Sequence, residues 1–192
     1  MKISGYVKDK GGISVEGATV EIKNDDFETL YQAYSDKNGY YEIRAKNEKY
    51  PFLVGVKSYG EENLEYWCQN IDLSRDVSLD IFFGKLEIYG LHAFDVKGAY
   101  PSLMVYFRPM SLEKFKAGEI DIAPEIHDIC VEIDNLKVEI YSKNKVGEFI
   151  GDRMLTAYLL QVSLPEGQDK WKRLSVEISD ENYNYGKAEI FS

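Results

Sequence analysis

Apolar and polar residues alternate at every second position in short runs along this 192-residue chain. Such alternation indicates β-strands with one buried face, because successive side chains of a strand point to opposite sides of a sheet. In the first third, the candidates for burial are Val20, Ile22, Tyr41 and Ile43. The pairs Gly11-Gly12 and Asn38-Gly39 lie between the runs, and glycine adopts positive φ at little cost. The first third is therefore predicted to be a β-meander.

The same stretch resembles a known family, the carboxypeptidase regulatory-like domain, which is a transthyretin-like β-sandwich. Its motif reads G-x-V, then G-A-x-V-x-I, then S-D-x-x-G-x-Y-x-I. The matching residues of this chain are Gly5, Val7, Gly17, Ala18, Val20, Ile22, Ser35, Asp36, Gly39, Tyr41 and Ile43. The resemblance covers residues 1–83 and implies a scaffold, because in carboxypeptidases this domain carries none of the peptidase chemistry. Relatives of this domain are often found outside the cytoplasm, so the sequence does not assign this chain to a cellular compartment.

Alternation continues beyond Gly84, but no family is recognised there. It predicts at least five further strands, around Leu86 and Ile88, Leu103 to Phe107, Val131 and Ile133, Val138 and Ile140, and Leu174 to Ile178. Asp134-Asn135 is a predicted turn, and Ser111 is a predicted cap for a short helix that ends at Gly118. We therefore expect an all-β protein of two domains. The first is the sandwich of residues 1–83, and residues 84–192 form a second, Greek-key-type sandwich with one short helix.

The charge of the chain argues against two classes of partner. Acidic residues outnumber basic ones by 33 to 23, which gives a net charge of −10. A negative chain repels nucleic-acid phosphates and anionic membrane surfaces. The nearest basic group, Lys170, Lys172 and Arg173, is typical of a solvated strand edge or turn. No apolar stretch approaches the length that spans a membrane, and no leader sequence is recognised. We expect neither nucleic-acid binding nor membrane insertion.

The sequence offers little that could support catalysis. Cys68 and Cys130 fall in different predicted domains, so free thiols are expected, and two cysteines alone make no zinc site. The chain has only two histidines, and His92 with Asp95 is the nearest approach to a metal-binding pair. No Gly-x-Ser-x-Gly turn and no phosphate-binding glycine motif is present. We predict no enzyme, no cofactor and no metal, and a metal on His92 and Asp95 is the enzymatic alternative.

The sequence contains parts of two other kinds of site, a calcium-binding loop and an isopeptide cross-link. The segment 36–39 fails as an EF-hand loop, because the first and twelfth ligand positions would fall on Tyr34 and Ala45. Looser calcium sites in acidic loops stay open, at Asp25, Asp26 and Glu28 or at Glu61 and Glu62. The B-type repeats of collagen adhesins share part of the glycine skeleton and join a first-strand lysine to an asparagine. Here Val7 takes the place of that lysine, and Lys8 would point to the opposite face, so no isopeptide bond is predicted.

Aromatic residues make up 14% of the chain, and 15 of them are tyrosines. Most are expected to cover pleated sheet surfaces. Tyr59, Tyr66 and Trp67 lie near the predicted loop Gly60-Glu61-Glu62 and are the candidate ligand-binding residues, although Trp67 is also a candidate for the core. The leading hypothesis is a non-catalytic structural or interaction module that presents loops and strand edges to a protein partner. The alternative is a carbohydrate-binding module that uses these three aromatics.

Overall fold

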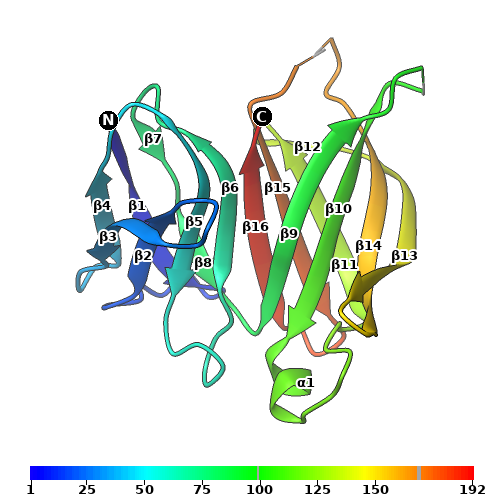
Figure 1. Ribbon diagram of the computed structural model, residues 1–192, viewed down its shortest axis with the longest axis horizontal. Coiled ribbons are helices and arrows are strands. Elements are labelled where there is room, and N and C mark those ends of the chain that lie inside the picture. Colours follow the sequence, from blue (N-terminus) through cyan, green and yellow to red (C-terminus); the bar gives the residue numbers. More distant parts are fainter. Residues whose placement is uncertain (99, 168–169) are drawn as a thin grey trace.

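The computed structural model describes residues 1–98, 100–167 and 170–192 (Figure 1). The all-β class with two sandwiches and one short helix is confirmed. The strands of the first half are β1 (Lys2–Asp9), β2 (Thr19–Lys23), β3 (Thr29–Tyr34), β4 (Tyr40–Arg44), β5 (Lys49–Val56), β6 (Tyr66–Asp72), β7 (Val77–Ser78) and β8 (Ile81–Phe83). The elements of the second half are β9 (Leu86–Asp95), β10 (Ser102–Ser111), α1 (Leu112–Lys116), β11 (Ile126–Ile133), β12 (Leu136–Lys137), β13 (Ile140–Ile150), β14 (Arg153–Ser163), β15 (Arg173–Asp180) and β16 (Tyr185–Phe191). In the described part of the chain, no helix has the length and apolar character needed to cross a bilayer.

The first sandwich is not a meander, and that expectation was wrong. β1 pairs with β4, β7 and β8 in one sheet, whereas β2 pairs with β3 and β5 in the other. The chain therefore crosses between the two sheets from β1 to β2, from β3 to β4 and from β4 to β5, because two one-sided apolar faces are buried by stacking against each other. The turn at Gly39 makes one of these crossings: its φ is 77°, and its carbonyl accepts a hydrogen bond from the Val7 N–H at 2.7 Å.

The family-motif residues have structural roles in this sandwich. The apolar ones lie in its core, and they are Val7, Ala18, Val20, Ile22, Tyr41 and Ile43. Ser35 ties two segments together, because its hydroxyl donates to the Val15 carbonyl and accepts from the Ala18 N–H. Asp36 accepts the N–H groups of Asn38 and Tyr40 and so fixes the turn before β4. The motif thus specifies a fold, as the resemblance implied.

The second sandwich consists of four hairpins that alternate between two sheets. One sheet has the order β13-β14-β10-β9, and the strands of the other are β12, β11, β15 and β16. Asp134 and Asn135 both have positive φ in the turn from β11 to β12, and Ser111 caps α1, as predicted. The core lies between the sheets and includes Phe107 stacked on Tyr158 at a centroid distance of 5.8 Å.

The two sandwiches share one sheet. β16 pairs in parallel with β6, so the order runs β12-β11-β15-β16-β6-β5-β2-β3. Cys68 lies in the first core and pairs with Glu189, whereas Ala188 lies in the second core and pairs with Trp67. Because paired residues share a face, the two cores lie on opposite faces of the shared sheet. In Figure 1, the sheet that contains β9 and β10 lies in front of β15 and β11.

A buried ion-pair cluster accompanies this junction. Glu189 is 3% exposed, and its carboxylate lies 3.3 Å from Nε of Arg173 and 3.6 Å from Nζ of Lys187. Burial raises the pKa of Glu189, and the two cations oppose this rise. Arg173 also donates to the Ser78 carbonyl of the first half. We propose residues 1–83 and 84–192 as two domains, joined through this sheet and cluster.

Candidate functional site

The three aromatic residues predicted to bind a ligand have very different surroundings. Tyr59 is 48% exposed, Trp67 is 8% exposed and Tyr66 is 1% exposed. Tyr66 lies in the first core, where burial raises the pKa of its hydroxyl, so a ligand cannot reach its ring. Tyr66 is therefore removed from the candidate ligand-binding residues. Neighbouring residues of a strand face opposite sides of the sheet, so Tyr66 of β6 points into the core and Trp67 points away from it. A ligand-binding role for Tyr59 and Trp67 stays a prediction.

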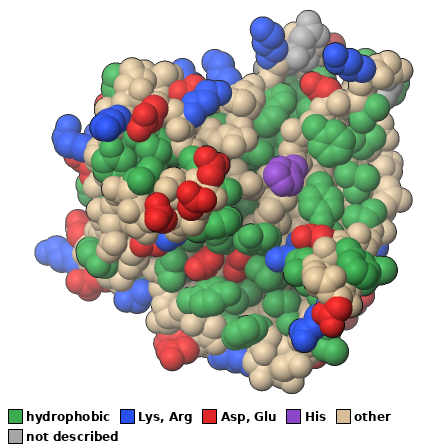
Figure 2. Space-filling model, viewed as in Figure 1, with side chains coloured by type: hydrophobic (Ala, Val, Ile, Leu, Met, Phe, Trp, Pro, Cys, Tyr) green, Lys and Arg blue, Asp and Glu red, His purple; other side chains and the backbone are tan. Residues whose placement is uncertain are grey.

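Trp67 lies in a groove at the inside corner where the two sandwiches meet. Phe52 and Gln69 accompany it on the shared sheet, and Phe27 comes from the loop between β2 and β3. Tyr89, Gly90 and His92 of β9 form the opposite wall, and the cavity has a volume of about 170 Å³. Figure 2 shows this face of the molecule, with hydrophobic side chains gathered over β9, β10 and β14. We call this cavity the corner groove.

The aromatic rings of the corner groove support one another. Phe27 stacks on Phe52 at 4.9 Å, and Trp67 meets Phe52 edge to face at 5.9 Å. Trp67 also meets Tyr89 edge to face at 5.4 Å. The Arg108 guanidinium lies 4.8 Å from the centre of the Tyr89 ring. Such contacts each stabilise an arrangement by roughly 0.5–1.5 kcal/mol beyond area burial, so the walls are held in place before any ligand arrives.

A buried carboxyl, that of Glu87, fixes the Trp67 indole of the groove wall. Glu87 is 1% exposed; it accepts hydrogen bonds from the Trp67 indole N–H at 2.9 Å and from the Glu65 backbone N–H at 3.1 Å. Burial, followed by the charge of Glu65, raises the pKa of Glu87 to about 8, although both hydrogen bonds and Arg108 act in the opposite direction. At pH 7 this carboxyl is therefore mostly protonated.

Glu87→Gln is expected to flatten the pH dependence of stability. Because folding raises the pKa of Glu87 from 4.5 to about 8, the folded protein keeps a proton that the unfolded chain releases between these values. The free energy of unfolding of the wild type therefore falls as the pH rises through this window, by up to about 1.4 kcal/mol per pH unit. Urea unfolding at several pH values measures both slopes, and equal slopes would show that Glu87 does not keep its proton.

A bulge in β9 shapes the groove wall. Gly90 has φ of 62° in mid-strand, and the register with β10 shifts between Tyr106 and Arg108. The extra residue keeps both Tyr89 and His92 on the outer face, because it adds one position to the alternation between them. Sequence reasoning missed Phe27, Phe52, Gln69 and Tyr89, which come from four separate segments. The one local signal is Phe27 itself, an apolar residue between Asp26 and Glu28.

Residues 1–98, 100–167 and 170–192 contain no group of three or more His, Cys, Asp or Glu side chains placed to hold a metal ion. His92 and Asp95 both lie on β9 and are exposed. Cys68 is buried, Cys130 is half-buried, and both are free thiols.

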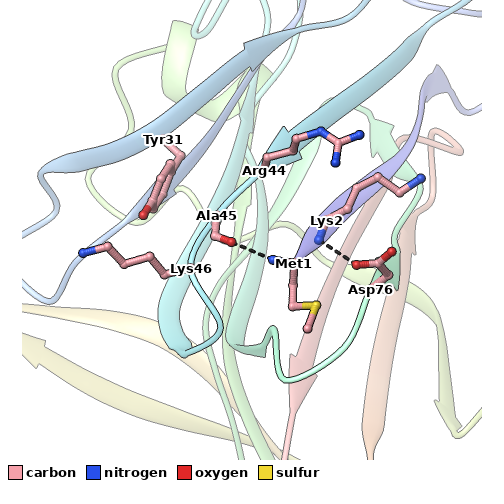
Figure 3. Close-up of a pocket in the computed structure, with 7 residues that line it drawn as sticks. All are labelled: Met1, Lys2, Tyr31, Arg44, Ala45, Lys46 and Asp76. Carbon is pink, nitrogen blue, oxygen red and sulfur yellow. Dashed lines mark hydrogen bonds between the residues drawn. The ribbon is translucent and has the colours of Figure 1, made fainter.

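A second candidate site lies at the far edge of the shared sheet, along β3. Within the described residues this strand pairs with β2 alone, and its Leu30 and Tyr34 are 47% and 65% exposed. Beside it, a cavity of about 540 Å³ opens between the edges of the two sheets of the first sandwich. Figure 3 shows its lining, which is Met1, Lys2, Tyr31, Arg44, Ala45, Lys46 and Asp76. We call this region the β3 edge.

Comparisons with known proteins agree with the architecture of the first half. Residues 2–78 match the family model of the carboxypeptidase regulatory-like domain, which confirms the resemblance. No curated protein matches the chain. Among solved structures, BcpA, the major pilin subunit of Bacillus cereus, is similar with a TM-score of 0.33 and 13% identity, over 98% of this chain and 67% of that one. A DUF3823 family protein from Bacteroides ovatus has a TM-score of 0.33 and 13% identity, over 99% and 97%. Similarity at this level assigns no function.

Proposed function

We propose that this protein is a non-catalytic interaction module that binds an extended segment of a protein partner at the β3 edge. The observation that carries this proposal is an edge strand of six residues without a charge or a proline. Unpaired backbone groups on such an edge are a template for another strand, unless charges or prolines protect them. The match of the first half to a regulatory-like domain supports a scaffold role.

The other long edge strands in the described part of the chain carry protecting charges. β13 contains Lys143, Lys145 and Glu148, and β9 ends at the exposed Asp95. β4 contains Glu42 and Arg44, which form an ion pair at 2.9 Å. Edge charges of this kind resist strand addition. The sixth strand, β6, would also be an edge of the first sandwich, but β16 covers it. β3 is therefore the edge best suited to receive a partner.

The cavity beside β3 indicates the chemistry of the partner. A strand added to β3 would place alternate side chains over the opening between the two sheets. Lys2, Arg44 and Lys46 line this opening, whereas Asp76 is the one acidic residue of the lining. Glu42 pairs with Lys2 and Arg44, which leaves Lys46 as the cation best placed to attract a new carboxylate. We therefore expect an extended partner segment with an acidic side chain at one of its inward positions.

Gln32→Pro is expected to weaken partner binding while the fold is kept. The Ser35 N–H donates to the Ala18 carbonyl and so points to β2, and by alternation the N–H groups of Tyr34 and Gln32 point to the free edge. Proline at position 32 removes one outward donor without breaking the ladder, since proline is tolerated on edges. Extended peptides selected from a displayed library should lose at least about tenfold in affinity, and Gln32→Ala, which keeps the N–H, should stay within about twofold.

Two results would contradict the proposed function. Selection of no peptide at all would show that the edge is not a template. Peptides that bind wild type and Gln32→Pro equally would show that binding occurs elsewhere. Circular dichroism of both variants checks that the sandwich is intact, and protection of the Gln32 and Tyr34 amides on peptide addition would locate the bound strand directly.

A further inference from the structure

The corner groove is separate from the β3 edge and is built for a smaller ligand. Its volume of about 170 Å³ lies below the range of roughly 300–1,000 Å³ that holds drug-sized molecules, and is close to that of a cavity that accepts benzene. One six-membered ring, or one side chain of similar size, therefore fills it. The walls are aromatic on both sides, with Phe27 and Phe52 facing Tyr89 across Trp67.

A polar group in the groove wall has no partner in the described part of the protein. Gln69 is 8% exposed, and its buried Oε1 makes no hydrogen bond there. A buried carbonyl oxygen without a donor destabilises the protein, because it has lost its hydrogen bonds to water. The terminal torsion of glutamine is soft, so a small rotation turns this oxygen into the groove, where a ligand donor can pair with it. A purely apolar ligand would leave the Gln69 oxygen without a hydrogen bond, so the groove favours a ring that carries hydroxyl or N–H donors.

The electrostatics of the groove favour a neutral ligand. Arg108 already covers the face of Tyr89 and pairs with Glu148 at 3.2 Å. The Glu148 carboxylate offsets the charge of Arg108, although the buried Arg108 Nε makes no hydrogen bond within the described residues. Arg108 also closes the face of the Tyr89 ring that a cation would use. The Glu87 carboxyl beneath Trp67 is mostly protonated at pH 7, because burial raises its pKa to about 8. An ammonium ligand would therefore find no full negative charge below the indole.

We propose that the corner groove binds one ring of a neutral saccharide, which packs against the side chains of Phe27, Trp67 and Tyr89 and hydrogen-bonds Gln69 through a hydroxyl. Sugar rings combine apolar C–H faces with hydroxyl donors, which is the combination that aromatic walls and an unpaired carbonyl oxygen recognise. His92 at the rim supplies a second polar contact to the outward hydroxyls. This site differs from the predicted carbohydrate site, because Tyr66 takes no part in it.

A glycan array probed with the labelled full-length chain tests this proposal. We expect binding to at least one neutral saccharide, followed by measurement of its affinity by titration calorimetry. Phe27→Ala should lower the affinity at least about tenfold, and the matched control Phe115→Ala should change it by less than about twofold. Both phenylalanines are 47% exposed, but Phe115 lies on α1, away from the groove lining.

Gln69→Leu completes the test, because it keeps the size of the side chain and removes its polar atoms. It should also lower saccharide affinity at least about tenfold, since the ligand hydroxyl is then left unpaired. No binding to any saccharide of the array would overturn the proposal. Binding that survives both Phe27→Ala and Gln69→Leu would also overturn it, because the sugar would then lie elsewhere. Gln69→Leu at wild-type affinity, with Phe27→Ala impaired, would overturn the hydrogen bond to Gln69. These variants leave β3 unchanged, so failure here is distinguishable from failure of the proposed peptide binding.

Discussion

Gly84→Ala is expected to lower the free energy of unfolding by about 3 kcal/mol, at the upper end of the usual cost of overpacking. A Cβ at position 84 would lie 2.0 Å from the Tyr185 carbonyl oxygen, and one at Gly186 would lie 2.6 Å from the Leu86 carbonyl oxygen. In both contacts the atom that the Cβ meets is a backbone oxygen, so no side chain can rotate away to relieve them. The linker between the sandwiches and the start of β16 must therefore separate. Chemical denaturation followed by circular dichroism measures the loss.

The matched control for this substitution is Gly11→Ala. Neither glycine has positive φ, and the nearest atom to a Cβ at position 11 is Oδ1 of the flexible Asp9 side chain, at 3.2 Å. The expected change is within about 0.5 kcal/mol, as for most surface substitutions. If Gly84→Ala were equally harmless, the close approach of the linker to β16 would be wrong.

Arg173→Ala is expected to cost about 3–5 kcal/mol, because it leaves the buried Glu189 without its nearest cation. The Glu189 carboxylate is 3.3 Å from Arg173 and 3.6 Å from Lys187, so one weaker pair would remain. The free energy of unfolding from urea denaturation measures the effect. Since the cluster joins the second domain to the first, we also expect Trp fluorescence and circular dichroism to report a single coincident transition in the wild type.

Glu189→Gln provides the internal check on this prediction. Added to Arg173→Ala, it removes the uncompensated charge, so the double variant should be more stable than Arg173→Ala alone. A cost below about 1 kcal/mol for Arg173→Ala would show that the pair behaves like an exposed one. A double variant less stable than Arg173→Ala would show that Glu189 stabilises the junction without Arg173.

The sequence allowed β2 and β4 of the first half, and the turns at Gly11-Gly12 and Asn38-Gly39, to be predicted, because period-two alternation and turn glycines are local signals. The same signals gave the short helix after Ser111 and the turn at Asp134-Asn135. The pairing of strands was not predictable in this way: alternation shows which residues are buried, but not whether consecutive strands lie in one sheet or in two. The meander prediction failed for this reason.

β16 was missed for a related reason, and it is the strand that joins the sandwiches. Its inward positions are Gly186, Ala188 and Ile190, so two small residues weaken the apolar alternation. The charged Lys187 and Glu189 between them suggest an exposed face, although Glu189 is 3% exposed. The cations beside Glu189 are Arg173 of β15 and Lys187 of β16, but its burial depends on β6 of the other sandwich, where Cys68 pairs with Glu189. A covering strand from elsewhere in the chain leaves no local pattern.

The candidate site was likewise predictable from the sequence only where its residues are marked by local signals. Trp67 was identified from its place among aromatics near a loop, but its neighbours in the corner groove come from the β2–β3 loop, β5, β6 and β9. Their meeting depends on the two sandwiches lying on opposite faces of one sheet. Tyr66 was assigned to the same site because it is adjacent in sequence, yet adjacency within a strand places side chains on opposite faces.

Amide hydrogen exchange measured by NMR tests most directly which edge of the first sandwich is free. The structure has β16 covering β6 and leaves β3 open. We expect the β6 amides that face β16 to exchange slowly, with cross-strand contacts between Cys68 and Glu189, and the Gln32 and Tyr34 amides to exchange fast. Fast exchange along β6, without contacts to β16, would contradict the shared sheet, and slow exchange at both Gln32 and Tyr34 in the protein alone would contradict the free edge on which partner binding depends.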